Sequence, residues 1–419
     1  MTYNFLSLQE ICSVNKNDDD RFVGIKINDN NVRIIFPLGY ALPTNEKELR
    51  QDIRALLILL AKFKKKEGSI NRENCSCNSK IEDFPILSFL DVLNSFIEKG
   101  GRYYTITEKK FLSNSKGKID FKKTIKKEKS FIKNNSIVYS KYQVSYNNQL
   151  SNSLITSIHK YCVFQAFSKF GWLYSSQLLL DPKIVLNKKL FLSELNKYYQ
   201  NTNRDRDKRL FKSMIEMIEF ISNKNGISSI SYGVDKFENI WEEMIDEAFG
   251  IKNKKDYFPH AIWHLKYGLQ KQSKAPLQPD SIMFYNGKIY ILDAKFYKYG
   301  CTKNPDHLPG SADINKQITY GEYVKNTKNT PLEKLYNAFL MPFNSQDKLF
   351  TNETEETNHS TCKNIINIGQ AIGEWKTNYE NYEQIQGILV DTRFLLLNYT
   401  KMSNDGKTLL SNAIENVLD

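Results

Sequence analysis

The stretch "QPDSIMFYNGKIYILDAKFYKYG", residues 278–300, predicts a β-hairpin and decides how the C-terminal part of the chain folds. Its centre, Asn286–Gly287, is a strong signal for a two-residue type I′ turn, because both positions of that turn need positive φ. The apolar runs "SIMFY" and "KIYILDAKFY" flank the turn, and their hydrophobicity is typical of strands buried in a sheet. We therefore expect the hairpin to lie in the hydrophobic core.

Charged residues occupy the ends of this hairpin that lie away from the turn. Asp280 stands at the start of the first strand, and Asp293 and Lys295 stand near the end of the second. Since successive side chains of a strand alternate between its faces, we expect Asp293 and Lys295 on one face and Ala294 on the other. The three charged groups are thus predicted to converge at one end of the hairpin, on one side of the sheet.

This set of charges favours a metal-dependent hydrolase. Two carboxylates held together repel each other and are expensive to desolvate unless a cation joins them. Mg²⁺ suits such an oxygen-rich site, because it binds one or two carboxylates together with waters and phosphate oxygens. Lys295 beside the metal could orient a water or stabilise charge on an attacked phosphate, as phosphodiester hydrolysis requires. The competing interpretation is an exposed hairpin whose charges meet by coincidence.

The pattern Pro279–Asp280 followed by Asp293–Ala294–Lys295 resembles the PD-(D/E)xK nuclease superfamily. Upstream, "FENIWEEMI" (237–245) resembles the first core helix of that superfamily. By this resemblance Glu242 supplies a further carboxylate, and Glu238, one turn earlier on the same face, is the reserve. The alternative is that both glutamates are ordinary acids on the solvent-facing side of a helix.

Downstream, Gln317 and Tyr320 in "DINKQITY" resemble the Gln-x-x-Tyr element that some branches of the superfamily place beside the substrate backbone. The resemblance implies an α/β nuclease core with a mixed central sheet flanked by helices. It implies catalysis by Asp280, Asp293, Lys295, Glu242 and Gln317, and binding of Mg²⁺ by Asp280, Asp293, Ala294 and Glu242.

Further motifs resemble a narrower group. "GKIDFKKTI", "NNSIVYSKY" and "SNSLITSIHKY" resemble the pattern that precedes the nuclease in McrC-type subunits. "LPGSADINKQITYGEY", "NAFLMPF", "IINIGQAIGEWK" and "IQGILVDTRFLLLNY" resemble the LlaJI-type restriction endonuclease family. The likeness runs from about residue 100 to the C-terminus. It implies an Mg²⁺-dependent restriction endonuclease of phage defence that hydrolyses double-stranded DNA together with a separate McrB-like AAA+ GTPase. The sequence has no Gly-x4-Gly-Lys-Ser/Thr motif, in agreement with that division of labour.

Three other functions stay open. The chain could be a self-sufficient type II restriction enzyme, a non-cleaving activator or adaptor subunit of a DNA-bound NTPase, or a repair or recombination nuclease. A gene for a McrB-like GTPase beside this one would favour the motor-coupled enzyme, whereas a methyltransferase gene alone would favour the type II enzyme. Cutting both strands needs two active sites, which a homodimer would provide.

The pattern of apolar residues predicts an α/β protein in three segments. Residues 1–145 are interpreted as an N-terminal α+β domain that binds DNA or a partner, 146–230 as a helical connector, and 231–419 as the nuclease domain. Helices are predicted at 45–66, 85–100, 235–250 and 311–326 and over much of 150–222, and strands at 22–36, 102–107, 335–344 and 365–369, with strand and helix together at 385–399.

Composition indicates an anionic partner only weakly. The 419 residues have a formal net charge of +12, but abundant Lys, Asn, Ile and Tyr are also expected from an AT-rich genome. Lysines gather in 108–135, interleaved with Phe111, Phe121 and Phe131, either to follow a phosphate backbone or as a solvated surface. The sequence shows no apolar run of about eighteen residues and no secretory signal, so we expect a cytoplasmic protein.

Histidines and cysteines give weaker signals. His260 and His264 have i,i+4 spacing, which could bind a metal if the segment is helical, but no third ligand follows at suitable spacing. Packing or phosphate contact is the favoured interpretation. His307 is a lone loop histidine, and Cys75 and Cys77 are interpreted as free, reduced cysteines.

Overall fold

A computed structural model describes most of the chain, namely residues 7–17, 21–28, 31–67, 84–114, 116–134, 136–150, 152–174, 179–223, 229–268, 270–273, 275–347, 364–376 and 380–416. Cys75 and Cys77 lie outside the described residues. The chain forms two compact units, one of residues 83–227 and the other of 2–82 together with 228–419. This division differs from the three predicted segments, because residues 2–82 cluster with the C-terminal part. The functions assigned to those segments stay predictions.

The larger unit contains a five-stranded mixed sheet. Its order is β12 (Ser281–Tyr285), β13 (Lys288–Ala294), β14 (Leu335–Phe343), β16 (Ile385–Asp391) and β15 (Ile365–Ala371). The three inner strands are parallel and the two edge strands run antiparallel to their neighbours. Asn286 and Gly287 have φ of 49° and 73°, which confirms the predicted type I′ turn between β12 and β13.

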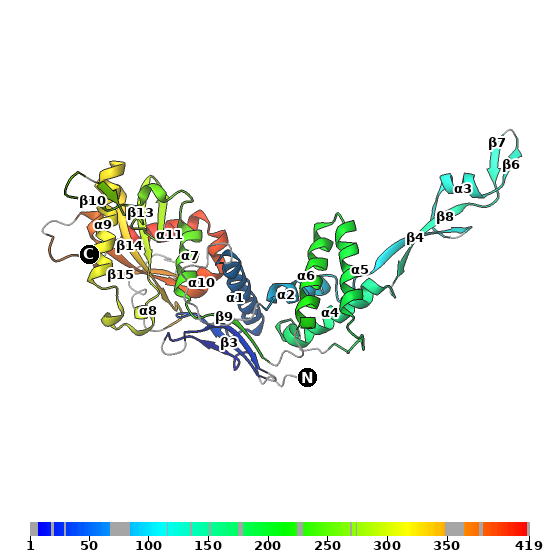
Figure 1. Ribbon diagram of the computed structural model, residues 1–419, viewed down its shortest axis with the longest axis horizontal. Helices are drawn as coiled ribbons and strands as arrows, with labels where there is room; N and C mark the ends of the chain where they lie inside the picture. Colours follow the sequence, from blue (N-terminus) through cyan, green and yellow to red (C-terminus); the bar gives the residue numbers. More distant parts are fainter. Residues whose placement is uncertain are drawn as a thin grey trace, which may run out of the picture. The chain divides into compact units, whose positions relative to one another are not determined.

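Helices cover both faces of this sheet, as Figure 1 shows. α9 (Ser311–Lys328) packs on one face, and the core there includes Ile291, Ile318 and Phe339. α7 (Glu238–Phe249), α10 (Thr392–Asn398) and α11 (Asn404–Glu415) pack on the other. The helices predicted at 235–250 and 311–326 are thus confirmed by α7 and α9, and the protein is a mixed α/β structure with several sheets.

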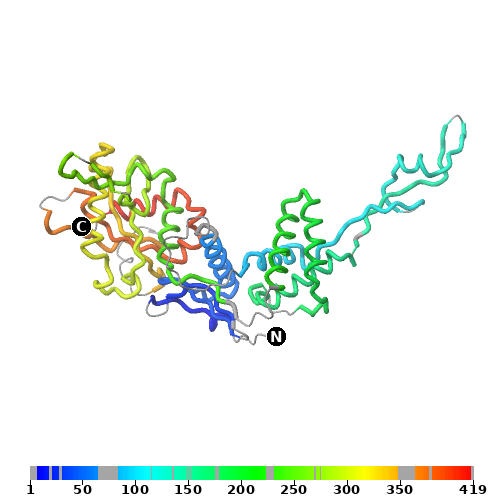
Figure 2. The backbone as a smooth tube through the Cα atoms, viewed as in Figure 1, coloured from blue at the N-terminus to red at the C-terminus, as the bar shows by residue number. Residues whose placement is uncertain are grey.

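A second sheet joins the two sequence segments that make up the larger unit. Its order is β1 (Cys12–Val14), β3 (Asn31–Phe36), β2 (Val23–Asn28) and β9 (Ser229–Val234). β2 and β9 pair in antiparallel fashion, although residues 29–228 separate them in the sequence. Figure 2 shows this pairing, with the blue N-terminal strands beside the green β9.

The N-terminal residues of this unit also contact the end of the central sheet. Gly39 has φ of 73° and lies against the backbone of Phe343, the last residue of β14, where a Cβ would meet the chain at 3.0 Å. Thr392 donates a hydrogen bond from its hydroxyl to the carbonyl of Leu38 at 2.9 Å. α1 (Glu46–Glu67) contacts α10 through Arg393. These residues are therefore part of the fold that carries the hairpin.

The smaller unit combines helices with thin antiparallel sheets. Its main helices are α2 (Ile86–Glu98), α4 (Leu154–Phe170), α5 (Lys188–Asn201) and α6 (Asp205–Asn223). α2 packs on α4 and α6, where Phe84, Phe89 and Phe170 form an aromatic cluster. The remaining elements are β4 (Ile106–Ser113), β5 (Lys118–Ile119), α3 (Phe121–Lys127), β6 (Ser130–Lys133), β7 (Ser136–Tyr139) and β8 (Gln143–Leu150).

Two local predictions differ from the structure. The strand predicted at 102–107 starts only at Ile106, because the backbone of Tyr104 bonds to side chains of α4: its N–H donates to His159 Nδ1 and its carbonyl accepts from the Thr156 hydroxyl, each at 2.8 Å. The helix considered for His260 and His264 is absent. There β10 (Ile262–His264) pairs with β11 (Gln270–Gln272), so i,i+4 spacing does not place the two imidazoles on one helix face.

Within the described ranges, no helix is both long and apolar enough to cross a membrane. The short helix α8 (Tyr299–Thr302) follows β13 and completes the elements of the larger unit.

Candidate active site

Asp293 and Lys295 lie together at the end of β13, as the alternation of the strand predicts. The side chain of Asp293 is 3% exposed, and its Oδ2 is 2.7 Å from Nζ of Lys295. The same ammonium is 2.9 Å from Oδ1 of Asp313, in the first turn of α9. The backbone N–H of Lys295 donates to the carbonyl of Leu340 in β14 at 2.9 Å, so the lysine is held by the sheet.

Asp280 is held beside Asp293 and Lys295 by a hydrogen bond across the hairpin. Its Oδ2 accepts a hydrogen bond from the N–H of Ala294 at 2.8 Å, and its carbonyl accepts from Nζ of Lys254 at 2.5 Å. Ala294 is buried, on the strand between the two residues of the ion pair. The hairpin therefore fixes Asp280 beside the residues that the sequence analysis grouped with it.

The carboxylates at this point are electrostatically coupled. Burial raises the pKa of Asp280 to about 7, with Asp293 and Glu242 adding to the rise and the Ala294 N–H and Lys295 opposing it. The pKa of Glu242 is raised by burial and then by Asp293, against the opposing effect of Lys295 and Lys316. Glu242 on α7 is half-buried, and Asp293 of the hairpin adds to the rise of its pKa.

Two lysines supply positive charge here. Burial alone would lower the pKa of Lys295, but Asp293 and Asp313 outweigh burial and raise it. Lys316 of α9, whose Nζ is 4.0 Å from Oδ1 of Asp293, has its pKa raised in the same way by Asp293 against burial. Both lysines therefore add positive charge beside Asp293.

The chemistry of these oxygens fits a divalent cation. Oδ1 of Asp293 is buried without a hydrogen-bond partner, and the ammonium of Lys316 is 4.0 Å away. A metal ion in direct contact with this oxygen would offset the cost of burying it. Over the described part of the chain, no three His, Cys, Asp or Glu residues are grouped as a metal-ion site. Mg²⁺ needs only one or two carboxylates with waters, so Asp280 and Asp293 fit that demand.

Gln317 and Tyr320 support the hairpin from α9. Nε2 of Gln317 donates to the carbonyl of Ile291 at 3.0 Å, while its Oε1 is buried without a partner. The hydroxyl of Tyr320 donates to the carbonyl of Gln278 at 2.8 Å. In this structure, then, both side chains hold the two strands of the hairpin in place.

Three charged residues near this point were not predicted: Asp313, Lys316 and Lys254. Asp313 and Lys316 precede Gln317 and Tyr320 at helical spacing, so all four occupy one face of α9. That spacing was a usable signal once "DINKQITY" had been assigned to a helix. Lys254, which also pairs with Asp246 at 2.8 Å, lies in an irregular segment where no periodicity points to it.

The remaining candidates make other contacts or are exposed. Glu238, the reserve for Glu242, has its Oε1 3.6 Å from a guanidinium nitrogen of Arg21. His307 hydrogen-bonds through Nδ1 to the hydroxyl of Thr302 at 2.7 Å. His260 and His264 are exposed.

Comparison with known proteins identifies the family. No curated protein sequence matches the chain. One solved structure, a refined half-complex from the tetradecameric assembly of Thermococcus gammatolerans McrB AAA+ hexamers with bound McrC, aligns over 92% of this chain and 82% of that chain. Its identity is 12% and its TM-score 0.32. A family model described as LlaJI restriction endonuclease matches residues 22–360 and thus reaches further toward the N-terminus than the resemblance read from the motifs. The chain belongs to the LlaJI restriction endonuclease family.

Proposed function

We propose that this protein is an Mg²⁺-dependent endodeoxyribonuclease whose active site is of the PD-(D/E)xK type. Membership of a restriction endonuclease family supports the reaction class. The observation that carries the site assignment is the buried Asp293 carboxylate, paired with Lys295 through one oxygen and without a hydrogen-bond partner at the other, which lies 4.0 Å from Nζ of Lys316. Asp280 and Asp293 would bind the metal, with Glu242 nearby and Ala294 positioning Asp280 through its N–H.

The side chains of the site have different roles in the proposed phosphodiester hydrolysis. When bound, Mg²⁺ supplies a water of lowered pKa and positive charge for the attacked phosphate. Lys295 contributes a permanent cation held by Asp293 and Asp313, which can stabilise the negative charge that develops on the phosphate. Lys316 adds a second cation close to Asp293. Gln317 acts on the site through β13 rather than on the substrate.

We further propose that cleavage of double-stranded DNA is coupled to a McrB-like AAA+ GTPase in the cytoplasm. The motifs in 117–161 that resemble McrC-type subunits support this pairing, as does the missing nucleotide-binding motif. A self-sufficient type II enzyme, and a homodimer that cuts both strands, are the alternatives that the same experiment separates.

The test is cleavage of plasmid DNA in Mg²⁺, with and without the AAA+ protein and GTP. We expect Asp293→Asn and Lys295→Gln each to reduce the cleavage rate by about 10²-fold or more. The first removes a carboxylate that would bind the metal, and the second removes a cation that would stabilise the reacting phosphate. The exposed pair Glu333→Gln and Lys334→Gln provides matched controls that should cleave normally. Wild-type cleavage by Asp293→Asn would refute the site, and full cleavage without the AAA+ protein would refute the coupling.

A further inference from the structure

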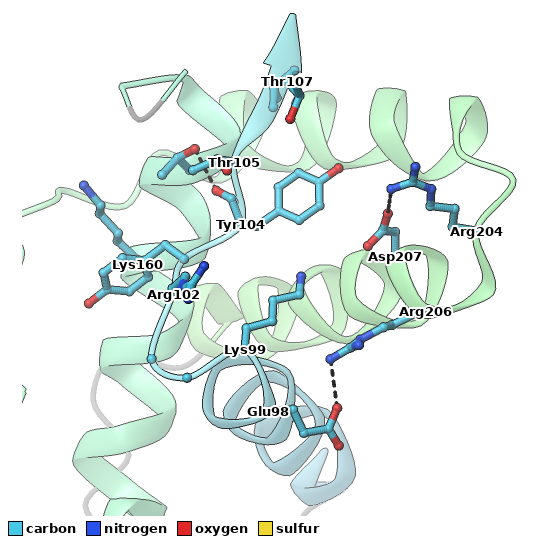
Figure 3. Close-up of a pocket in the computed structure, with 15 residues that line it drawn as sticks. Glu98, Lys99, Arg102, Tyr104, Thr105, Thr107, Lys160, Arg204, Arg206 and Asp207 are labelled. Carbon is cyan, nitrogen blue, oxygen red and sulfur yellow. Dashed lines mark hydrogen bonds and ion pairs between the residues drawn. The ribbon is translucent and has the colours of Figure 1, made fainter. Parts of the chain in front are cut away.

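A cavity of about 1270 Å³ lies in the smaller unit, where the end of α2 leads into β4. Residues 98–107 form one wall, and Thr156 and Lys160 of α4 another. Arg204, Arg206 and Asp207, at the start of α6, complete it, as Figure 3 shows. Pockets for small molecules usually have roughly 300–1,000 Å³ and mostly apolar walls. This larger, polar cavity therefore suits an extended ligand.

Positive charge dominates the wall of the cavity. Its acidic side chains, Glu98 and Asp207, each form an ion pair with an arginine. Glu98 is 2.9 Å from Arg206, and Asp207 is 4.0 Å from Arg204. The other cations of the wall are Lys99, Arg102 and Lys160. The wall thus carries three cations more than its own acids can balance.

These three cations have no acidic partner. In the parts of the chain that the structure describes, neither Lys99, Arg102 nor Lys160 forms an ion pair. The pKa of Lys99 is lowered by burial and by the nearby Arg206, despite the opposing effect of Asp207. An anion in the cavity would relieve this excess of charge, and the positive end of the α6 dipole would add to the attraction.

Two aromatic rings lie close to two of these cations. Nζ of Lys99 is 5.3 Å from the ring centre of Tyr104, and Nζ of Lys160 is 5.6 Å from that of Tyr103. Figure 3 shows the ring of Tyr104 among Lys99, Arg204 and Asp207. Its backbone is fixed on both sides by hydrogen bonds to α4, so the ring is presented from a rigid segment. Cations that follow a backbone, interleaved with rings on which bases stack, are the two components of sites for single-stranded nucleic acid.

We propose that this cavity binds a single strand of nucleic acid, with Lys99, Arg102 and Lys160 on its phosphates and Tyr104 against a base. The site is distinct from the carboxylate cluster of β13 and does not depend on the proposed nuclease activity. A duplex fits less well, because its stacked bases leave no free face for the ring.

The test is fluorescence anisotropy of a labelled single-stranded DNA oligonucleotide with the full-length protein in EDTA, over a range of salt concentrations. EDTA keeps the result independent of the metal site and of cleavage. We expect the variant Lys99→Gln/Arg102→Gln/Lys160→Gln to bind more weakly and to lower the slope of log K against log salt by about 2, at roughly 0.7 per phosphate contact. The charge-matched control Lys189→Gln/Lys197→Gln/Lys212→Gln, with exposed lysines outside the cavity, should keep the wild-type slope.

A second variant separates stacking from charge. Tyr104→Leu should weaken binding by about 5-fold or more while leaving the salt slope unchanged, since base stacking carries no counterion release. Thermal unfolding of each variant checks that the unit stays folded. Equal slopes for the cavity and control variants would overturn the proposal. So would displacement of the oligonucleotide by GTP or by polyglutamate at equal charge concentration, which would identify a nucleotide or an acidic peptide as the ligand.

Discussion

At the scale of single residues, the charges around Asp293 explain one another. The acid is buried at the end of β13. One of its oxygens contacts Lys295, and the other has no hydrogen-bond partner but lies 4.0 Å from Lys316. Burial, together with the nearby Asp293 and Glu242, raises the pKa of Asp280 to about 7. Asp280, Asp293 and Lys295 could be predicted because they are close in sequence and share a hairpin. Asp313 and Lys316 could not be predicted from the hairpin, because they belong to α9, which is separate from the hairpin in the sequence and packs against the sheet.

The raised pKa of Asp280 makes metal binding depend on pH. Without metal, a carboxyl whose pKa is raised stabilises the fold at low pH, and this contribution is lost as pH rises from about 3.8 to about 7. A divalent cation favours the ionised form, so its stabilising effect should grow over the same rise. We expect Mg²⁺ to increase the unfolding temperature more at pH 8 than at pH 6.

Differential scanning fluorimetry of the wild type and of Asp280→Asn, with and without Mg²⁺, measures this effect. The asparagine variant cannot titrate at this position and should lose the pH dependence. An equal shift at pH 6 and pH 8 in the wild type would contradict the role of Asp280.

At the scale of elements, β13 and α9 carry most of the charged residues of the candidate active site. Gln317 joins α9 to β13 by donating to the carbonyl of Ile291, and Nδ2 of Asn337 in β14 donates to the carbonyl of Gln317 at 3.0 Å. The hairpin and α9 were predictable because turn chemistry and apolar periodicity are local signals. The strand expected at 102–107 was not, because side chains of α4 take up the hydrogen bonds of Tyr104, and that contact is not local.

Loss of the Gln317 side chain should loosen this pair. Gln317→Ala leaves the carbonyl of Ile291 without its buried donor, so we expect the free energy of unfolding to fall by roughly 1–3 kcal/mol. Cleavage should fall as well, because α9 also carries Asp313. Asn315→Ala, on an exposed position of the same helix, is the matched control. Urea denaturation followed by circular dichroism gives the values, and equal stability of the two variants would exclude a positioning role for Gln317.

At the scale of the whole molecule, residues 2–82 belong to the unit that carries the candidate active site. The sequence predicts strands in 22–36. The alternation of side chains does not reveal which strand pairs with them, and the partner of β2, β9, is far away in the chain. The match of the family model from residue 22 agrees with this arrangement. The N-terminal strands are thus as much a part of the endonuclease fold as the hairpin.

An ion pair between α1 and α10 should be essential to that arrangement. Nε of Arg393 is 2.7 Å from Oδ2 of Asp52, whose side chain is 2% exposed. Arg393→Ala would leave a buried carboxylate unpaired, so we expect a loss of about 3 kcal/mol in the free energy of unfolding. Lys47→Ala, at an exposed position of α1, should change it by less than about 0.5 kcal/mol. A small effect of Arg393→Ala in chemical denaturation would show that the N-terminal residues are held mainly by other contacts.

The pairing of β2 with β9 also bears on the order in which the protein takes shape on the ribosome. The edge of β2 that pairs with β9 stays open until residue 234 has left the ribosome, and α2, α4, α5 and α6 of the inserted unit leave the ribosome before it. Such an edge is a template for association with other chains, so translation through residues 83–227 is the interval in which a chaperone would do most to keep newly made molecules apart.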